Sequence, residues 1–338
     1  VVDSIKSKNL FILSGSANLL LMSQVSESLA GRAVFFALRP FSMGEMKDSS
    51  PPIILKRLLS EFKPVLKSYQ GGNPPNHNSK ILSKDALFKQ MIKGFMPPLA
   101  GTNSLRTVLQ WYEGYIATYL EKDLRQLSQI HSLPDFRRVM EAVALRSGGL
   151  INQTEIARDV GVSQATIFRY LNILETTCLL KRVPAFAKNR TKRLIKAPKT
   201  YFVEPGLTAF LAGFHDPIAF KGTKESGSVF ESLVLLHLSI LCDLLTHKDR
   251  IYYWRSASGK EVDFVIEHGK SLLGIEAKLA SQVSYQDTGG LRAFLEEYPE
   301  AQAGIVIYSG KEILSLGDRI FGIPWECLAL HDNHSDNE

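Results

Sequence analysis

The chain has 338 residues, of which 45% are hydrophobic and 22% are charged, with a net charge of +6 and an isoelectric point near 9.0. This composition is typical of a soluble globular chain with two or three hydrophobic cores, and its basic balance favours a polyanionic partner. Cys178, Cys242 and Cys327 lie far apart without C-x-x-C spacing, which excludes a disulfide framework and a zinc ribbon and fits a reducing cytoplasm.

The longest apolar run covers residues 230–245 and contains Glu231, His237 and Asp243. It is too short and too polar to cross a bilayer, so it predicts a buried helix in a cytoplasmic protein with no membrane partner. The chain opens on Val1 rather than methionine, close to an apolar, strand-like segment at 10–13. We therefore expect the natural protein to extend further on the N-terminal side.

The predicted elements begin with a buried strand at 11–16 and a helix through Leu29. Turn-forming residues dominate 42–52 and 70–75, with a short helix at 54–66 between them. The pattern predicts helices over 83–127, with Trp111, Tyr115, Ile116, Tyr119 and Leu120 on one face, and a second helical unit over 133–180. Short strands and one long helix then alternate from 201 to about 330, and 331–338 forms a disordered tail.

Residues 154–174 have the pattern of a helix-turn-helix unit. The residues that would bury one helix against the other are Ile156, Val160, Val162, Ile167 and Tyr170. Gly161 supplies a turn with positive φ, and Ser163 caps the second helix. This arrangement leaves Gln164, Phe168 and Arg169 pointing outward, where a recognition helix meets a major groove.

A basic run follows at 181–199, which contains no acidic residue. Its basic residues are Lys181, Arg182, Lys188, Arg190, Lys192, Arg193, Lys196 and Lys199. Such a run predicts salt-sensitive DNA binding. The candidate DNA-binding residues are Gln164, Arg169, Lys188, Arg190, Lys192 and Arg193. In the alternative interpretation the helical motif packs domains together and the run is a solvated face; the outward Phe168 favours that protein-contact interpretation.

Two alternating segments, 261–267 and 272–278, predict a β-hairpin with the loop 268–271 and with Asp263 opposite Glu276. One face would be apolar and would comprise Val262, Phe264, Ile266, Leu273 and Ile275. The other would comprise Glu261, Asp263, Glu276 and Lys278. Facing carboxylates repel each other unless a cation lies between them, and oxygen ligands favour magnesium.

We therefore predict a site in which Asp263, Glu276 and Glu231 hold Mg²⁺ while Lys278 orients or activates the attacking water. A helix acid, a strand acid and a strand E-x-K in this order resemble the restriction-endonuclease-like superfamily. Residues 45–47 also fit E-x-K but lie in loop-like sequence with no partner strand. The alternative is an ordinary hairpin with a solvated charged face.

The triplet Gly269-Lys270-Ser271 matches the end of a phosphate-binding loop, but Phe264 stands where the first glycine belongs. The triplet also joins two predicted strands instead of leading into a helix, so it lacks helix N-terminal amides for phosphates. The chain therefore has no P-loop of its own.

Nearly the whole chain resembles a family of predicted AAA+ superfamily ATPases with a C-terminal domain of unknown function. The strings that carry the resemblance are LSGSAN (13–18), SLAGR (28–32), LRPFS (38–42), YLEKDL (119–124), PKTYF (198–202), FE (230–231), YWR (253–255) and EVDF (261–264). The resemblance implies that 11–16 is the sensor strand of an ATPase core. It also implies that Ser14, Asn18 and Arg32 face ATP in the intact protein.

The chain departs from this family in two respects. The phosphate-binding loop and the acidic magnesium strand, expected upstream, are absent from the sequence. Phe95 also stands where family members usually have the second glycine of a pair, and phenylalanine resists positive φ, so we expect an altered loop there.

The predicted fold class is α/β, in five segments. They are a C-terminal part of an AAA+ core (1–50), a helical linker (51–130), a winged-helix-like domain (131–200), a restriction-endonuclease-like domain (201–330) and the tail (331–338). We favour an ATP-binding protein, an ATPase when intact, whose C-terminal domains bind DNA or a protein partner. A magnesium-dependent nuclease and a non-catalytic interaction module remain as alternatives.

Overall fold

The computed structural model of the protein describes residues 36–60, 82–118, 130, 132–245 and 250–330. The predicted strand at 11–16, the candidate ATP-facing residues Ser14, Asn18 and Arg32, the linker at 70–75 and the tail lie outside the described residues. Two helices, α2 (Met43–Met46) and α3 (Ile54–Ser60), occur in the first described stretch. The prediction of turns alone over 42–52 was wrong, because Ser42 and Glu45 form a reciprocal capping box that starts α2.

The middle of the chain is mainly helical. Its helices are α5 (Lys84–Lys93), η2 (Pro97–Leu99), α6 (Leu105–Tyr115), α8 (Leu133–Ala144), α9 (Gln153–Val160), α10 (Gln164–Thr176), α11 (Arg190–Ile195) and α12 (Pro205–Leu211). A small antiparallel sheet has the order β1 (Gly149–Leu150), β3 (Lys199–Phe202), β2 (Leu180–Val183). One hydrophobic core joins residues from Leu99 to Leu211, so it extends across the predicted boundaries at 130 and 200.

The α9–α10 pair confirms the local predictions for this segment. Gly161 has φ +77° in the turn, and the Ser163 side chain accepts a hydrogen bond from the backbone N–H of Thr166. Ile156 and Ile167 are fully buried between the helices. The 3.6-residue period was sufficient here because both helices bury one face against the same core.

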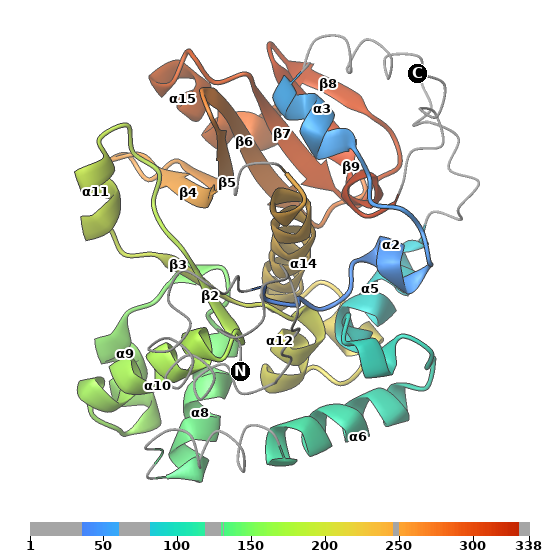
Figure 1. Cartoon of the computed structure of the whole chain (residues 1–338), viewed down its shortest axis with the longest axis vertical. Coiled ribbons are helices and arrows are strands. Elements are labelled where there is room, and N and C mark those ends of the chain that lie inside the picture. The colour runs from blue at the N-terminus through green and yellow to red at the C-terminus, as the bar shows by residue number, and fades with distance from the viewer. Residues whose placement is uncertain (1–35, 61–81, 119–129, 131, 246–249, 331–338) are drawn as a thin grey trace, which may run out of the picture.

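The rest of the described chain is an α/β layer. After α13 (Pro217–Phe220) and α14 (Lys224–Asp243) come β4 (Arg250–Arg255), β5 (Glu261–His268), β6 (Ser271–Lys278), η4 (Tyr285–Thr288), α15 (Gly289–Glu297), β7 (Ala303–Tyr308), β8 (Leu314–Gly317), β9 (Ile320–Pro324) and η5 (Trp325–Leu328). The six strands form one sheet in the order β4-β5-β6-β7-β9-β8, in which β6, β7 and β9 are parallel. Helices α14 and α15 cover opposite faces of this sheet (Figure 1).

Helix α14 runs through the middle of the molecule (Figure 1). It is long and apolar enough to cross a membrane by composition, but 72% of its apolar window is buried inside the fold. The prediction of a buried helix is therefore confirmed, but the premise that the helix is too short to cross a bilayer was wrong, because α14 begins at Lys224 and has 20 residues.

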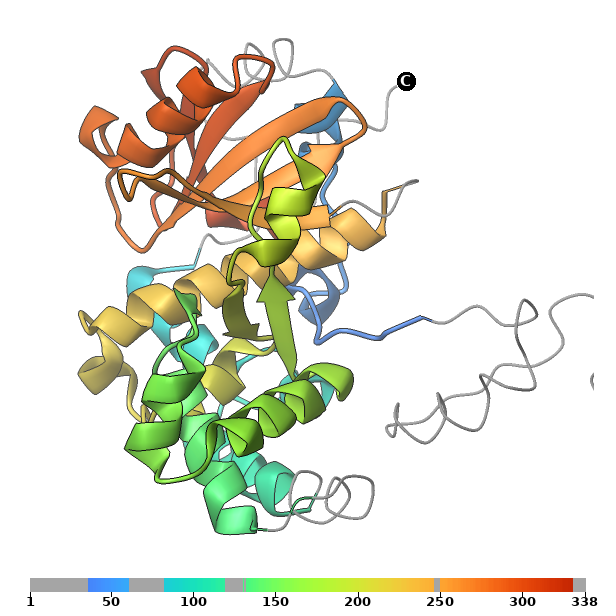
Figure 2. The same cartoon turned by 90° about the vertical axis from the view of Figure 1, so that its left-hand side faces the viewer.

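The connection between β2 and β3 leaves the mainly helical half of the molecule, which runs from α5 to α12, and packs against the six-stranded sheet, called the large sheet below (Figure 2). Ala185 forms a parallel bridge with Tyr253 of β4, and the backbone N–H of Tyr253 donates to the carbonyl of Pro184 over 2.9 Å. These contacts hold α11 beside the edge strand of the large sheet.

The stretch that contains α2 connects the two halves. The N–H of Met43 donates to Nε2 of the buried His237 on α14 over 3.1 Å, and Arg39 pairs with Asp243 at the end of that helix over 2.6 Å. The N–H of Phe41 donates to the carbonyl of Phe95 over 2.8 Å. Only Gly94 needs positive φ in this loop, at +74°, so Phe95 fits as a buried core residue and the expected conflict does not arise.

Candidate acidic site

The β5–β6 hairpin has the predicted partners but a tighter turn. Its register pairs Phe264 with Ile275 and His268 with Ser271, so the loop has two residues rather than the four predicted. If this register continues by one residue, Asp263 lies opposite Glu276, as predicted. Oδ2 of Asp263 also accepts a hydrogen bond from the N–H of Ala277 over 3.0 Å. Gly269 has φ +59°, which suits the first position of a two-residue hairpin turn.

A β-bulge in β5 changes the predicted faces of this hairpin. Tyr252 pairs with Val265 and Trp254 pairs with Val262, so the single residue Tyr253 of β4 lies opposite two residues of β5, Asp263 and Phe264. Strict alternation is therefore broken, and Val262 packs in the α15-side core while Phe264 packs in the α14-side core. The prediction that they share a face was wrong, because a bulge inserts one residue and re-aims its neighbours.

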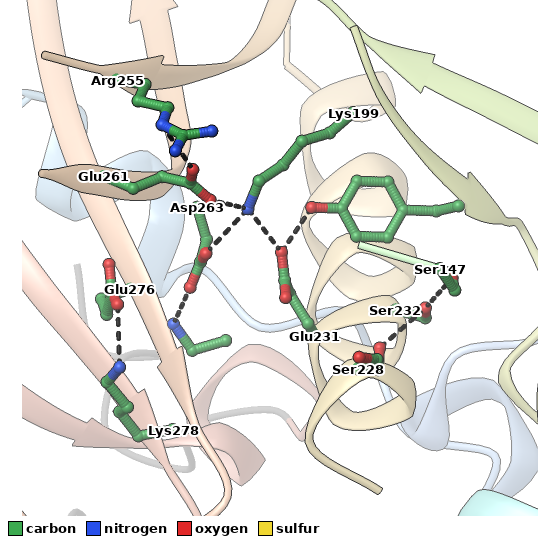
Figure 3. Close-up of polar contacts among 12 residues, drawn as sticks. Ser147, Lys199, Ser228, Glu231, Ser232, Arg255, Glu261, Asp263, Glu276 and Lys278 are labelled. Atoms are coloured by element: carbon green, nitrogen blue, oxygen red, sulfur yellow. Dashed lines mark hydrogen bonds and ion pairs between the residues drawn. The ribbon is translucent and has the colours of Figure 1, made fainter. Parts of the chain in front are cut away.

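Three carboxylates converge on Lys199, the first residue of β3 (Figure 3). Nζ of Lys199 lies 2.5 Å from Oε1 of Glu261, 3.0 Å from Oδ1 of Asp263 and 3.1 Å from Oε1 of Glu231. Its side chain is only 3% exposed. Burial by itself lowers the pKa of Lys199, but the three acids outweigh burial and raise this pKa above its ordinary value.

Glu231 comes from α14, whose N-terminus is capped by the side chain of Thr223. Oε1 of Glu231 also accepts a short hydrogen bond from the hydroxyl of Tyr201, which lies two residues after Lys199 on the same strand. Gly148, with φ +81°, approaches the other carboxylate oxygen so closely that a Cβ would lie 3.0 Å from it. The small sheet of the helical half therefore completes a site whose acids belong to the α/β layer.

The second part of the cluster lies on β6. Oε1 of Glu276 pairs with Nζ of Lys278 over 2.9 Å, whereas its buried Oε2 has no hydrogen-bond partner among the described residues. Burial and the nearby charge of Asp263 raise the pKa of Glu276 to about 8 and that of Glu231 likewise to about 8. Protons thus offset excess negative charge in a cluster where four carboxylates face Lys199, Lys278 and the more exposed Arg255.

The structure thus brings together all four predicted site residues, Glu231, Asp263, Glu276 and Lys278, but it adds Lys199 at the centre. Within the described ranges, no group of three or more His, Cys, Asp or Glu side chains is arranged to hold a metal ion. The acids nevertheless fit a divalent cation in donor chemistry, since Asp263 and the unpartnered oxygen of Glu276 offer hard oxygen ligands. Sequence reasoning placed Lys199 in the basic run and assigned neither Lys199 nor Tyr201 to the site; the available signal was the string PKTYF, which carried the family resemblance.

The basic run is used partly inside the protein. Lys199 is buried among the acids, and Lys181 donates to Oγ of Ser239 on α14 over 2.7 Å. Arg193 forms a two-point ion pair with Glu267 over 2.7 and 3.0 Å. Lys188 pairs with Glu300 over 3.0 Å, while Arg190, Lys192 and Lys196 are exposed. Much of the run therefore joins the two halves rather than forming a solvated face.

The outward positions on α10 are as predicted for Gln164 and Phe168, which are exposed. Arg169 is half-buried, with its guanidinium 5.4 Å from the ring centroid of Tyr170. Asn172 accepts a hydrogen bond from Arg182 over 2.8 Å. The N-terminal end of α10 is thus the exposed part of this helix.

Three family models match the chain in consecutive segments. An AAA domain matches residues 1–47, a domain of unknown function (DUF8612) matches 84–217, and another (DUF4143) matches 226–328. The chain combines an AAA-domain match with C-terminal domains of unknown function. This domain order confirms the resemblance to AAA-type proteins that the sequence strings indicated.

Relatives of similar organisation occur in mycobacteria. An uncharacterized protein of Mycobacterium bovis and one of Mycobacterium tuberculosis are each 27% identical to the chain over 314 residues, which is 93% of the chain. The chain spans 62% of the length of each of these relatives.

Proposed function

We propose that the intact protein is an AAA-type ATPase whose C-terminal domains bind DNA and carry a site for one divalent cation at Asp263 and Glu276. The observation that carries the cation site is the buried Oε2 of Glu276, which lacks a hydrogen-bond partner among the described residues. A buried carboxylate oxygen without a partner is costly unless a proton or a cation satisfies it.

The AAA-domain match supports the ATP-binding part of the proposal. The C-terminal end of that matched segment contacts α14 through Met43 and His237 and through Arg39 and Asp243. Helix α14 also carries Glu231 of the acidic cluster. A movement of the ATPase core would therefore act on the helix that supplies one of the acids.

The order of elements supports the two C-terminal assignments. The proposed winged helix is supported by the order α8, β1, α9, α10, β2, α11, β3, in which α10 would be the recognition helix. The proposed restriction-endonuclease-like core is supported by the order α14, β4, β5, β6, α15, β7, with an acid on the first helix and E-x-K on β6. Both assignments agree with a protein that acts on nucleic acid.

In this proposal Asp263 and Glu276 hold the cation, which would supply stabilisation of charge on a phosphate. Lys278 lies within hydrogen-bond distance of Glu276 and would orient a water for attack. Lys199 and Tyr201 hold Glu231, and Lys199 also holds Asp263, so they position the acids rather than touch the substrate.

A second candidate function is a non-catalytic interaction module. The observation that favours it is the ammonium group of Lys199, which already neutralises the acids from the centre of the cluster. In that case Asp263 and Glu231 act as internal ion-pair partners that join the two halves of the molecule.

Thermal unfolding with and without Mg²⁺ separates these candidates. A cation at a hundred times its dissociation constant stabilises the folded state by about 2.7 kcal/mol, which raises Tm by roughly 5 °C or more. We expect this increase in the wild type and its loss in Asp263→Asn. A wild type whose Tm does not respond to Mg²⁺ or Mn²⁺ would refute the cation site and support the interaction module.

Cleavage and DNA binding need their own measurements. Wild type with Mn²⁺ is expected to nick supercoiled plasmid, and Lys278→Ala is expected to leave it intact. Replacing Arg190 and Lys192 by Gln should lower affinity for duplex DNA and reduce the salt slope by about 2. Lys311→Gln is the control, because Lys311 is an exposed lysine in the connection between β7 and β8. Equal loss in the control would show that affinity follows the net charge and not the cations of α11.

A further inference from the structure

Helix α11 presents two aliphatic side chains to solvent at its C-terminal end. Leu194 is 85% exposed and Ile195 is 79% exposed. They are consecutive residues on a protruding six-residue helix (Figures 1 and 2). Two adjacent aliphatic residues held this far out of the fold indicate a contact with another molecule.

The segment around α11 is anchored to the large sheet on both sides of the exposed pair. The guanidinium of Arg193 pairs with Glu267 and lies 4.5 Å and 4.8 Å from the ring centroids of Phe186 and Tyr252. The hydroxyl of Tyr253 donates to the carbonyl of Ala197 directly after the helix, over 2.6 Å. Because these anchors lie on both sides of the aliphatic pair, the pair projects from a segment that is held at both ends.

The surroundings of the aliphatic pair are basic. Arg190, Lys192, Lys196 and, on the β5–β6 turn, Lys270 are exposed, and no described carboxylate forms an ion pair with any of them. Arg190 and Lys270 also line a cavity of about 380 Å³ beside the helix, where the two lining carboxylates, Glu267 and Glu300, are paired with Arg193 and Lys188. The exposed cations and the aliphatic pair together fit a polyanionic partner that also offers an apolar layer.

We infer that Leu194 and Ile195 form a wedge that enters the minor groove of duplex DNA and bends it. This inference rests on the DNA-binding part of the proposed function. The minor groove is about 6 Å wide, and aliphatic side chains inserted between base steps kink the duplex while flanking cations hold the phosphates. Both views show α10 and α11 on the same flank with β2 and β3 between them, so one duplex is able to run along both (Figures 1 and 2).

The test uses the full chain, an A·T-rich duplex of about 30 base pairs labelled at both ends for energy transfer, and the same duplex with 2-aminopurine. We expect wild type to bind, to bring the ends closer and to raise 2-aminopurine fluorescence by unstacking. Leu194→Ser with Ile195→Ser should weaken binding on the order of tenfold and remove both signals. Its salt slope should be unchanged, because the phosphate contacts remain. Ile218→Ser is the matched control, since Ile218 is 83% exposed on a different helix.

Leu194→Lys with Ile195→Lys distinguishes a wedge from general electrostatic attraction. Added charge alone predicts tighter binding with an unchanged bend, whereas a wedge predicts loss of the bend despite the extra charge. Wild type that binds DNA without bending it would overturn the wedge and leave the proposed DNA binding intact. Wild type that binds anionic vesicles but no duplex at low salt would overturn both, and the Mg²⁺ response would still report separately on the acidic site.

Discussion

Replacing Lys199 by Met removes the one buried cation at the centre of the acidic cluster. The change preserves most of the side-chain volume, so packing against β3 is largely kept. It leaves Glu231, Glu261 and Asp263 facing one another with no ammonium between them. The variant therefore measures what the ion pairs contribute to folding.

We expect the loss to be about 3–5 kcal/mol at pH 9, because removing one partner of a buried ion pair leaves an uncompensated charge. The pH dependence follows from the acids. Lys199 has a raised pKa and stays protonated below its ordinary value of 10.5, so its contribution is present from pH 5 to pH 9. In the variant the carboxylates take up protons more readily in the folded state, so the loss should shrink as pH falls to 5.

Urea denaturation followed by circular dichroism at pH 5, 7 and 9 measures this difference. Lys196→Met is the control, because Lys196 is an exposed lysine three residues earlier in the same connection. The control should change the free energy of unfolding by less than about 0.5 kcal/mol. An equal loss for Lys199→Met at all three pH values, or a loss below about 1 kcal/mol, would refute the electrostatic account of the cluster.

Three other predictions concern single groups. Glu276→Gln should stabilise the metal-free protein above pH 8 by about 1–3 kcal/mol, because the raised pKa of Glu276 means that its ionised form destabilises the folded state. In wild type this group makes the free energy of unfolding fall as pH rises from 4.5 to 8, and denaturation of the variant should show a smaller fall. A fall as steep as in wild type would contradict this prediction. Gly94→Ala should lower the free energy of unfolding, measured by thermal denaturation, by about 3 kcal/mol or more, because the added Cβ would collide with Glu204 and Tyr112. Gly161→Ala, at a similar φ but with open space around it, should lower it by about 1 kcal/mol. Equal losses would mean that φ alone matters. Calorimetry of this chain with ATP and Mg²⁺ should detect no P-loop-type binding, because Gly269-Lys270-Ser271 is a hairpin turn between β5 and β6; tight stoichiometric binding would refute that interpretation.

Local pattern in the sequence was sufficient for the elements whose neighbours are close along the chain. The α9–α10 pair, its Gly161 turn, the Ser163 cap and the β5–β6 hairpin each depend on contacts within about twenty residues, and the 3.6- and 2-residue periods record which face is buried. The pairing of Asp263 with Glu276 followed from the same hairpin. These features are fixed by short-range sterics and by hydrophobic alternation, so the sequence alone determined them.

Tertiary structure decided which charges are internal. Lys199 and Arg193 belong to a run without acids, and only folding brings Asp263 and Glu267, more than sixty residues away, into contact with them. The bulge at Asp263 likewise depends on pairing with β4, which local alternation within β5 does not encode. Ion pairs between distant segments depend on how the two halves pack, and the free energy of burying a charge depends on every neighbour at once. For that reason the sequence determined the acids of the site, and only the tertiary structure decided that a lysine from the small sheet lies among them.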